Sequence, residues 1–378
     1  MKTILPQVPG PAPCGQSSAR GEDNGFASEV DAVSEARWSE ITADFADANL
    51  YQTWPYGIVR SGRANVSHLL LALGSEVVVA VQARLARIPL LPLGAAYVLS
   101  GPLWQRRNRP VDVEIFRQAV RALRDEYVRR RKWIVRLVPN LADGEGEPFR
   151  RILAEEGYVF RLRARRRRTI LMDIRPTMEE LYLGLHQKWR NCLNKARKQN
   201  LEIIAGEEDH LFEAFANIFG EMVNRKQLVN FTGPDHCRQA QATLLPHEKA
   251  WVCLCKFEGE VCAGGICSAL GDTGIYLFGA TSNLGMKNCA SYLVHWKMLE
   301  WVKSRGCQTY DLNGINPVIN AGGYQFKSRL AGAHGHDVQL LGEFDAYPNA
   351  AIKWLVHTGD QLMARFEKGR ETLARFIR

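Results

Sequence analysis

The residues with the clearest chemical potential lie in one short stretch, residues 310–330. The stretch begins with the side chains of a buried strand, and Asn313, Gly314 and Pro317 end that strand. We expect a turn to follow, which carries Phe326 and Lys327 away from the end of the strand. A lysine in this position can remain solvated, or it can lie over a reacting carbonyl as a fixed positive charge. The residues alone leave both roles open.

Length and charge set the first limits on the class of protein. The chain has 378 residues, so we expect two domains. Its formal net charge of +9 indicates a polyanionic partner, which can be a nucleic acid, a phosphorylated substrate or an anionic membrane face. No apolar run is long enough to span a bilayer and no signal pattern opens the chain, which predicts a cytoplasmic protein.

The nine cysteines are scattered, which does not fit a disulfide framework in a chain of this size. Those of the segment around residues 251–270 lack Cys-x-x-Cys spacing and a histidine partner, so we predict buried thiols and no metal site.

Positioning of the stretch at 310–330 requires elements on both sides of it. Residues 1–34 are rich in Pro, Gly and Ser and predict a disordered or loosely ordered leader. Strands and helices then alternate irregularly, which predicts an α/β fold. Pro55 should keep residues 50–57 out of a regular helix, and strands are expected at 68–83 and in a meander over 251–281.

Two clusters of positive charge occur near the middle of the chain. The arginine-rich residues 161–168 can form a solvated edge strand or a strip that contacts phosphates. A helix with a capping box at Thr177 and Glu180 should continue to about residue 196 with an apolar stripe. Its other faces carry Lys188, Arg190 and Lys195, which predicts either an ordinary solvated face or a contact with RNA.

A series of short motifs follows one order along the second half of the chain. A helix over 288–303 is followed by Gly306-Cys307, by Tyr-Asp-Leu-Asn-Gly-Ile at 310–315 and by Gly-Tyr-Gln-Phe-Lys at 323–327. These motifs resemble the FemABX family of peptidoglycan-bridge aminoacyltransferases, in a compact form without a coiled-coil arm. The resemblance extends over roughly residues 168–332 and is faint in the first half.

The resemblance implies a fold of two tandem GNAT-like acyltransferase domains, with the C-terminal helix packing back on the first. The first domain would comprise residues 35–165 plus 345–378, and the second residues 166–344. The basic C-terminal segment leaves room for peripheral contact with the inner face of the membrane.

The resemblance also implies roles for particular residues. The catalytic residues would be Lys327 and Phe326, with Lys327 supplying positive charge at the reacting carbonyl. Asp311 is the nearest carboxylate, and on a buried strand we expect it to anchor the loop that bears Lys327. The residues implied in binding the substrate are Arg225, Arg60, Trp54 and Tyr324, and those implied in binding tRNA are Lys188, Arg190 and Lys195.

The implied reaction is attack by a primary amine on the ester of an aminoacyl-tRNA, with no cofactor beyond this co-substrate. The acceptor would be a phosphate-bearing peptidoglycan precursor or a related peptide. The alternative is an acyl-CoA-dependent GNAT N-acyltransferase of exopolysaccharide or natural-product biosynthesis. Residues 282–288 lack the second glycine and the first cation of a CoA pyrophosphate loop, which disfavours it. A noncatalytic RNA-binding protein is a further alternative, but it gives no reason for the Tyr-Gln-Phe-Lys motif.

Overall fold

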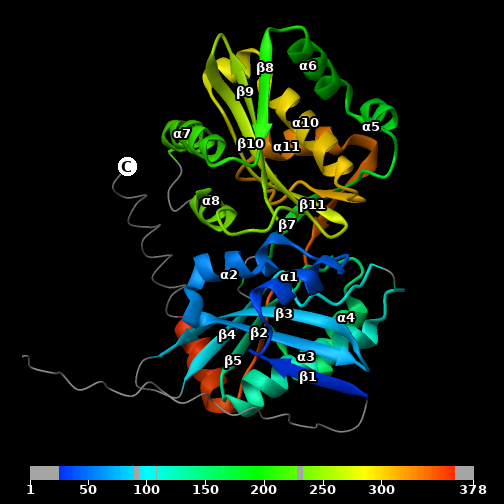
Figure 1. Ribbon diagram of the computed structural model, residues 1–378, viewed down its shortest axis with the longest axis vertical. Coiled ribbons are helices and arrows are strands. Elements are labelled where there is room, and N and C mark those ends of the chain that lie inside the picture. The colour runs from blue at the N-terminus through cyan, green and yellow to red at the C-terminus, as the bar shows by residue number, and fades with distance from the viewer. Residues whose placement is uncertain are drawn as a thin grey trace, which may run out of the picture.

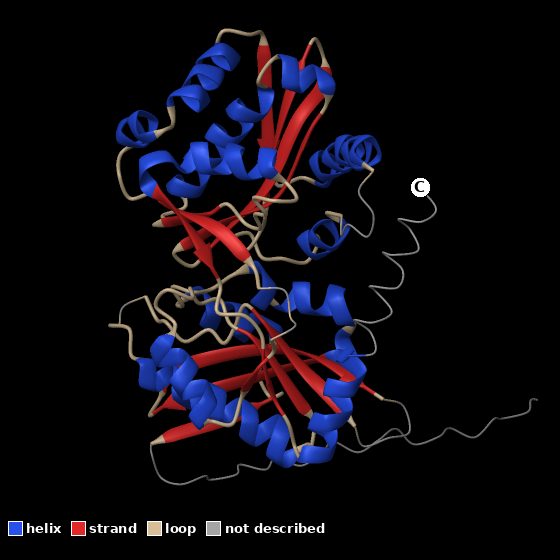
Figure 2. Ribbon diagram, turned by 180° about the vertical axis from the view of Figure 1, so that it is seen from behind, coloured by secondary structure: helices blue, strands red, loops and turns tan. Residues whose placement is uncertain are grey.

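The computed structural model describes residues 25–88, 93–107, 109–162, 164, 166–227 and 233–361. Two seven-stranded sheets are stacked along the long axis of the molecule, the first sheet below the second in Figure 1. Helices flank both sheets, as the view from behind shows (Figure 2). The predicted α/β class is thereby confirmed.

The first sheet is built from residues 26–160 and from one strand that arrives much later in the chain. Its order is β1-β2-β3-β4-β5-β14-β6. Apolar residues of successive strand positions face opposite sides, so one core forms under α3 and α4 and a second under α1. The strands are β1 Phe26–Val30, β2 Val66–Leu73, β3 Glu76–Arg87, β4 Gly94–Leu99, β5 Ile134–Val138, β6 Val159–Phe160 and β14 Phe344–Ala346; the helices are α1 Glu35–Ala43, α2 Trp54–Ser61, α3 Val113–Leu123 and α4 Glu147–Glu155.

The second sheet is built from residues 168–339, in the order β13-β7-β12-β11-β10-β9-β8. The helices α6, α10 and α11 cover one face, and α7 and α8 cover the other. The strands are β7 Arg168–Asp173, β8 Leu201–Gly206, β9 Trp251–Phe257, β10 Glu260–Leu270, β11 Thr273–Thr281, β12 Thr309–Asp311 and β13 Gly335–Gln339; the helices are α5 Met178–Gly184, α6 Gln187–Arg197, α7 Asp209–Lys226, α8 Asp235–Gln241, α9 Asn283–Lys287, α10 Ala290–Ser304 and α11 Ala321–Ala331.

The two sheets contain the same arrangement of strands and helices. Each is antiparallel except for a single parallel pair, β4 with β5 and β11 with β12. A helix connects the strands of each pair, α3 in the first sheet and α10 in the second. The meander predicted over 251–281 is confirmed as β9, β10 and β11.

The half of the molecule that contains the first sheet and the half that contains the second are joined by backbone contacts. They are also joined by the end of the chain, which returns to the first half after β13. The amide of Asp272, in the turn between β10 and β11, donates to the carbonyl of Ala46 at 2.7 Å. After β14, residues 350–361 form a helix, and Arg161 beside β6 donates to Asp360 of that helix at 2.6 Å. Among the described residues, no helix combines the length and the apolar character that crossing a membrane requires.

Several local predictions need correction. The predicted leader lies outside the described residues up to position 24, but its later part contains β1, whose exposed central residues give no apolar alternation. The capping box of Thr177 and Glu180 is confirmed. The helix that it starts ends at Gly184, because Leu185 is extended and His186 caps a new helix, α6, by accepting from the amide of Lys188.

Candidate active site

The loop that follows β12 is fixed by a buried carboxylate. Asp311 is 4% exposed, and its Oδ1 accepts from the amide of Asn313 at 2.7 Å and from the hydroxyl of Thr169 on β7. Asn313 adopts a left-handed conformation with φ of 56°, which asparagine tolerates better than most residues. Asp311 therefore holds the start of the loop against the sheet, as expected from the sequence.

Lys327 lies on a helix, and the predicted turn at this place is wrong. The pair Gly322-Gly323 suggested a turn, but both residues fall in the first turn of α11. Asn320 caps this helix by accepting from the amide of Gly323 at 3.1 Å, which offsets the low helix propensity of glycine. The helix directs Lys327 back toward the loop, where Nζ donates to the carbonyls of Asn313 at 3.2 Å and Gly314 at 3.0 Å.

The surroundings of Lys327 lower the pKa of its ammonium group. Burial lowers this pKa to about 8, against a smaller opposing effect of Asp311. Nζ lies 5.1 Å from the centroid of the Tyr276 ring, a cation–π distance. His295 packs on Tyr276, and burial, with the charge of Lys327 adding to it, lowers the pKa of His295 to about 3. Lys327 is thus a cation beside a neutral imidazole, with one of its three donors uncommitted.

Phe326 packs among the rings of neighbouring helices. Its centroid is 5.9 Å from that of Trp189 on α6, 5.0 Å from Tyr292 and 4.9 Å from His295, both on α10. Tyr324 is half-buried on the preceding turn of α11, against the same core. The aromatic residues before Lys327 therefore fix the position of α11 on α6 and α10.

Arg225 lies at the end of α7 and contacts the chain that follows β11. Its guanidinium donates to the carbonyl of Thr281 at 2.6 Å and to the side chain of Asn283 at 3.1 Å. Arg225 is thereby held against the segment that links β11 to α9, whereas Arg60 lies on α2, so the two predicted substrate-binding arginines come from different halves of the molecule.

Trp54 and Arg60 lie on α2, a regular helix, which corrects the prediction of an irregular segment. Pro55 occupies the first turn, where its missing N–H costs no hydrogen bond. Trp54 stacks on His68 of β2, with centroids 3.6 Å apart and an interplanar angle of 3°, so its ring belongs to the packing of α2. Arg60 is half-buried, and its Nε is buried with no partner among the described residues.

The predicted tRNA-binding residues occupy α6, but they are not equally available. Lys188 is exposed near the start of this helix. Arg190 donates to the carbonyl of Leu183 at 2.9 Å, and Lys195 donates to the carbonyl of Lys287 at 3.0 Å. Two of the three cations therefore already hold parts of the fold together.

Two arginines pack against tyrosine rings of the first half: Arg84, which the sequence did not single out, and Arg167, which belongs to the arginine-rich residues 161–168. Arg84 on β3 stacks over Tyr97, with its Cζ 4.7 Å from the ring centroid, and the Cζ of Arg167 is 6.0 Å from the ring of Tyr51. A signal for Arg84 exists in the sequence, because Gln82 and Arg84 are polar at alternate positions of an otherwise apolar strand.

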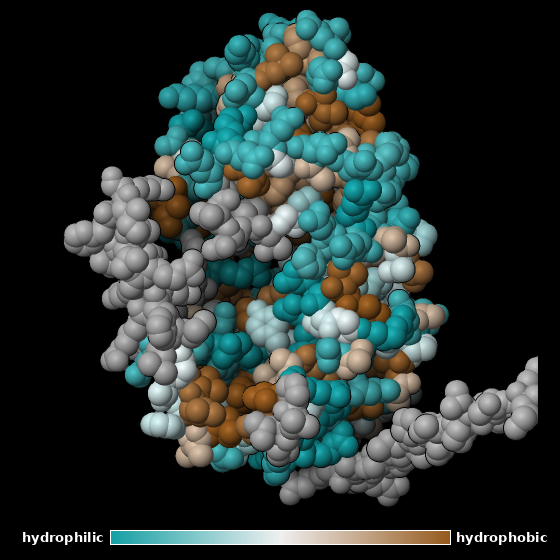
Figure 3. Space-filling view, turned by 90° about the vertical axis from the view of Figure 1, so that its left-hand side faces the viewer, coloured by the Kyte–Doolittle hydropathy of each residue, from teal (hydrophilic) through white to brown (hydrophobic). Residues whose placement is uncertain are grey.

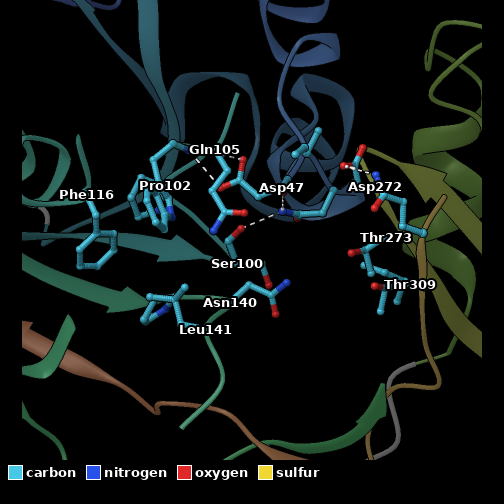
Figure 4. Close-up of a pocket in the computed structure, with 17 residues that line it drawn as sticks. Asp47, Ser100, Pro102, Gln105, Phe116, Asn140, Leu141, Asp272, Thr273 and Thr309 are labelled. Atoms are coloured by element: carbon cyan, nitrogen blue, oxygen red, sulfur yellow. Dashed lines mark hydrogen bonds between the residues drawn. The ribbon is translucent and has the colours of Figure 1, made fainter. Parts of the chain in front are cut away.

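A cavity of about 270 Å³ lies between the two halves (Figure 4). Asp47 and Asp272 contribute to its wall, and Thr273 and Thr309 are the first residues of β11 and β12. The loop that holds Lys327 follows the other end of β12, so this cavity is separate from the lysine. Burial raises the pKa of Asp47 to about 7, although two backbone amides donate to its carboxylate.

Comparison with known proteins identifies related sequences and folds. Residues 256–358 match the model of the FemAB family. The crystal structure of FemX is similar with a TM-score of 0.73 and 14% identity, over 87% of this chain and 99% of that chain. A conserved protein of unknown function from Bacteroides thetaiotaomicron VPI-5482 is similar with a TM-score of 0.55 and 12% identity, over 84% of this chain and 98% of that chain. No curated protein matches the sequence.

Proposed function

We propose that this chain is an acyltransferase of the FemABX family and transfers the aminoacyl group of an aminoacyl-tRNA to a primary amine of a peptidoglycan precursor or a related peptide. The match of residues 256–358 to the FemAB family and the fold shared with FemX support this proposal. The observation that carries the proposal is the setting of Lys327. This ammonium group lies within the matched residues, two backbone carbonyls hold it in place, and burial strengthens its field.

The proposed chemistry needs a fixed charge more than it needs a nucleophile on the enzyme. The neutral amine of the acceptor attacks the ester carbonyl, and the tetrahedral adduct carries its negative charge on oxygen. The uncommitted N–H of Lys327 would stabilise this oxyanion. The attack forms the C–N bond; as the adduct collapses, the carbonyl re-forms, the ester C–O bond breaks, and a proton lost from the amine goes to the released tRNA hydroxyl. An aminoacyl ester is already activated, so positioning and charge supply most of the catalysis.

The other proposed contacts follow from the positions of the basic residues. Lys188 is available on α6 for the tRNA backbone, and the proposed ligands of the acceptor remain Arg225, Arg60, Trp54 and Tyr324. A charged-tRNA donor implies that the enzyme works in the cytoplasm, on an acceptor that is free or carried at the inner face of the membrane. The proposal requires no cofactor and no metal.

The test is transfer of radiolabelled amino acid from a mixed pool of charged tRNA to cell-wall precursor. Lys327→Ala should reduce the rate on the order of 10²–10³-fold, because it removes one donor to the oxyanion. Lys297→Ala is the matched control, since Lys297 is a lysine of the adjacent α10 paired with Glu300. Transfer from acetyl-CoA alone, in a parallel reaction, would overturn the aminoacyl-tRNA proposal and favour the CoA-dependent alternative.

A further inference from the structure

A group of arginine and tyrosine side chains lies on the face of the first sheet that α2 covers. Arg84 on β3 is in register with Tyr97 on β4, and its guanidinium stacks on that ring. Arg167 precedes β7, stacks over Tyr51 and donates a long hydrogen bond of 3.4 Å to the hydroxyl of Ser100. Figure 3 shows the side of the molecule that bears α2, α7 and α8, which is hollowed between the two halves.

This group continues in both directions along the first half. The rings of Tyr51 and Tyr56 are 5.4 Å apart, and Arg60 follows Tyr56 by one turn of α2. Burial raises the pKa of Tyr56, and the nearby charges of Arg60 and Arg84 oppose this rise. The group therefore extends from Arg60 across β3 and β4.

The opposite end of the group approaches the loop of the candidate active site. Burial raises the pKa of Tyr51 to about 12, the charge of Arg167 lowers it, and Asp311 is among the charges that raise it. Asp311 is the carboxylate that holds Asn313, whose carbonyl accepts from Lys327. Arg167 precedes Thr169 by two residues, and the hydroxyl of Thr169 donates to Asp311, so Arg167 lies next to the loop that positions the lysine.

Three arginines of this group are not paired with carboxylates in the part of the chain that the structure describes. Among the described residues Arg60, Arg84 and Arg167 form no ion pair, whereas Arg136 on the adjacent β5 is paired with Asp345 at 2.9 Å. Burial lowers the pKa of Arg84, and the charge of Arg60 lowers it further. Like charges that are partly removed from water destabilise a fold unless an anion joins them, so this arrangement suits a bound ligand.

We propose that Arg84 and Arg167 form a receptor for an oxyanion group, a carboxylate or a phosphate, of the acceptor substrate. Both guanidinium groups have a face against a tyrosine ring, which leaves their N–H edges for the planar, bidentate contacts that arginine makes with such groups. The receptor lies on the first half, separate from Arg225 on α7. The inference rests on the proposed function only in assigning the anion to the acceptor.

Binding of small anions to the full chain tests the receptor. Inorganic pyrophosphate and succinate are titrated separately by calorimetry into wild type, Arg84→Gln and Arg167→Gln. Wild type should bind at least one probe, and each variant should bind it about tenfold more weakly or worse, because a charged hydrogen-bonding partner is lost. Tighter binding of pyrophosphate identifies a phosphate-bearing acceptor, and tighter binding of succinate identifies a carboxylate near the accepting amine.

Arg87→Gln is the matched control. Arg87 is on the same strand, its Cζ stacks 5.6 Å from the Trp133 ring, and it has no ion pair among the described residues. The Arg87→Gln protein should bind the probes with an affinity within about twofold of that of wild type. The proposal is overturned if neither probe binds wild type, if Arg84→Gln and Arg167→Gln bind as tightly as wild type, or if Arg87→Gln loses as much affinity.

Two further measurements separate this inference from a folding defect and from the proposed function. Arg84→Lys keeps the charge without the planar fork, so it should show an affinity between those of wild type and Arg84→Gln at an unchanged melting temperature. In the transfer assay, Arg84→Gln should raise the KM for the acceptor and leave kcat within about twofold. Anion binding that needs Arg84 in a protein without transfer activity would refute the proposed function and keep the receptor.

Discussion

The surroundings of Lys327 lower its pKa, so that it loses its charge at a lower pH than a free lysine. Its pKa in the folded protein is about 8, compared with 10.5 for a free lysine, and burial is the main cause. Below about pH 8 the buried ammonium group is charged, and its burial lowers the free energy of unfolding by its full amount. This destabilisation is lost as pH rises from about 8 to 10.5, because the group is then neutral in the folded protein. The neutral form that then dominates cannot stabilise an oxyanion by charge.

Transfer activity should therefore fall as pH rises through about 8 in the wild-type protein. In Lys327→Arg this fall should be absent, because a guanidinium stays charged throughout that range, although the overall rate will be lower. The measurement is the pH profile of kcat/KM at saturating tRNA for both proteins. An identical decline in both would show that another group titrates.

Helices and strands differ in how well the sequence alone predicts them. The strands of the meander, β9 to β11, are evident because apolar runs alternate with glycine-containing turns. The helices α2 and α11 are not evident, because Pro55 and Gly322-Gly323 suggest breaks and are tolerated only through their places in a first turn. Arg84 was missed for a related reason: its partner Tyr97 is distant in sequence, and their contact depends on register between β3 and β4.

The helix α6 makes a testable contribution as an element. Lys188→Ala should weaken binding of tRNA and reduce the slope of log affinity against log salt by about one, because one phosphate contact is lost. Lys195→Ala should act differently and also lower the melting temperature, since Lys195 donates to the carbonyl of Lys287, the last residue of α9. Filter binding at several salt concentrations and thermal unfolding measure the two effects.

Arg151→Ala serves as a control for this experiment. Arg151 is a largely exposed residue of α4, which flanks the first sheet, and its side chain is 68% exposed beside Glu147. Its loss should leave the salt slope of tRNA binding unchanged. An equal effect of all three substitutions would mean that tRNA responds to net charge and not to α6.

The whole molecule depends on a close approach between its two halves. Gly271 has φ of 62°, and a Cβ at this position would lie 2.3 Å from the carbonyl oxygen of Ala46. A side chain there would push the turn between β10 and β11 away from the first half. The active-site loop follows β12, which pairs with β11, so the same displacement would reach the neighbourhood of Lys327.

Gly271→Ala should therefore lower the melting temperature more than Gly259→Ala. Both glycines have positive φ, so both substitutions incur a backbone strain of about 1–2 kcal/mol. Only Gly271 also meets backbone of the other half, whereas no atom lies within 4 Å of a Cβ at Gly259. Differential scanning calorimetry of the two variants measures the difference, and equal melting temperatures would show that the contact does not stabilise the molecule.

The place of β14 has a consequence for how the protein is made on the ribosome. This strand, Phe344–Ala346, lies between β5 and β6, and β6 pairs with no other strand among those described. It also brings Asp345, the buried partner of Arg136. A nascent chain that has released its first 343 residues can complete the second sheet but not the first. The half that is synthesised first is therefore the half that finishes folding last, and during elongation its open edge is exposed to association with other chains.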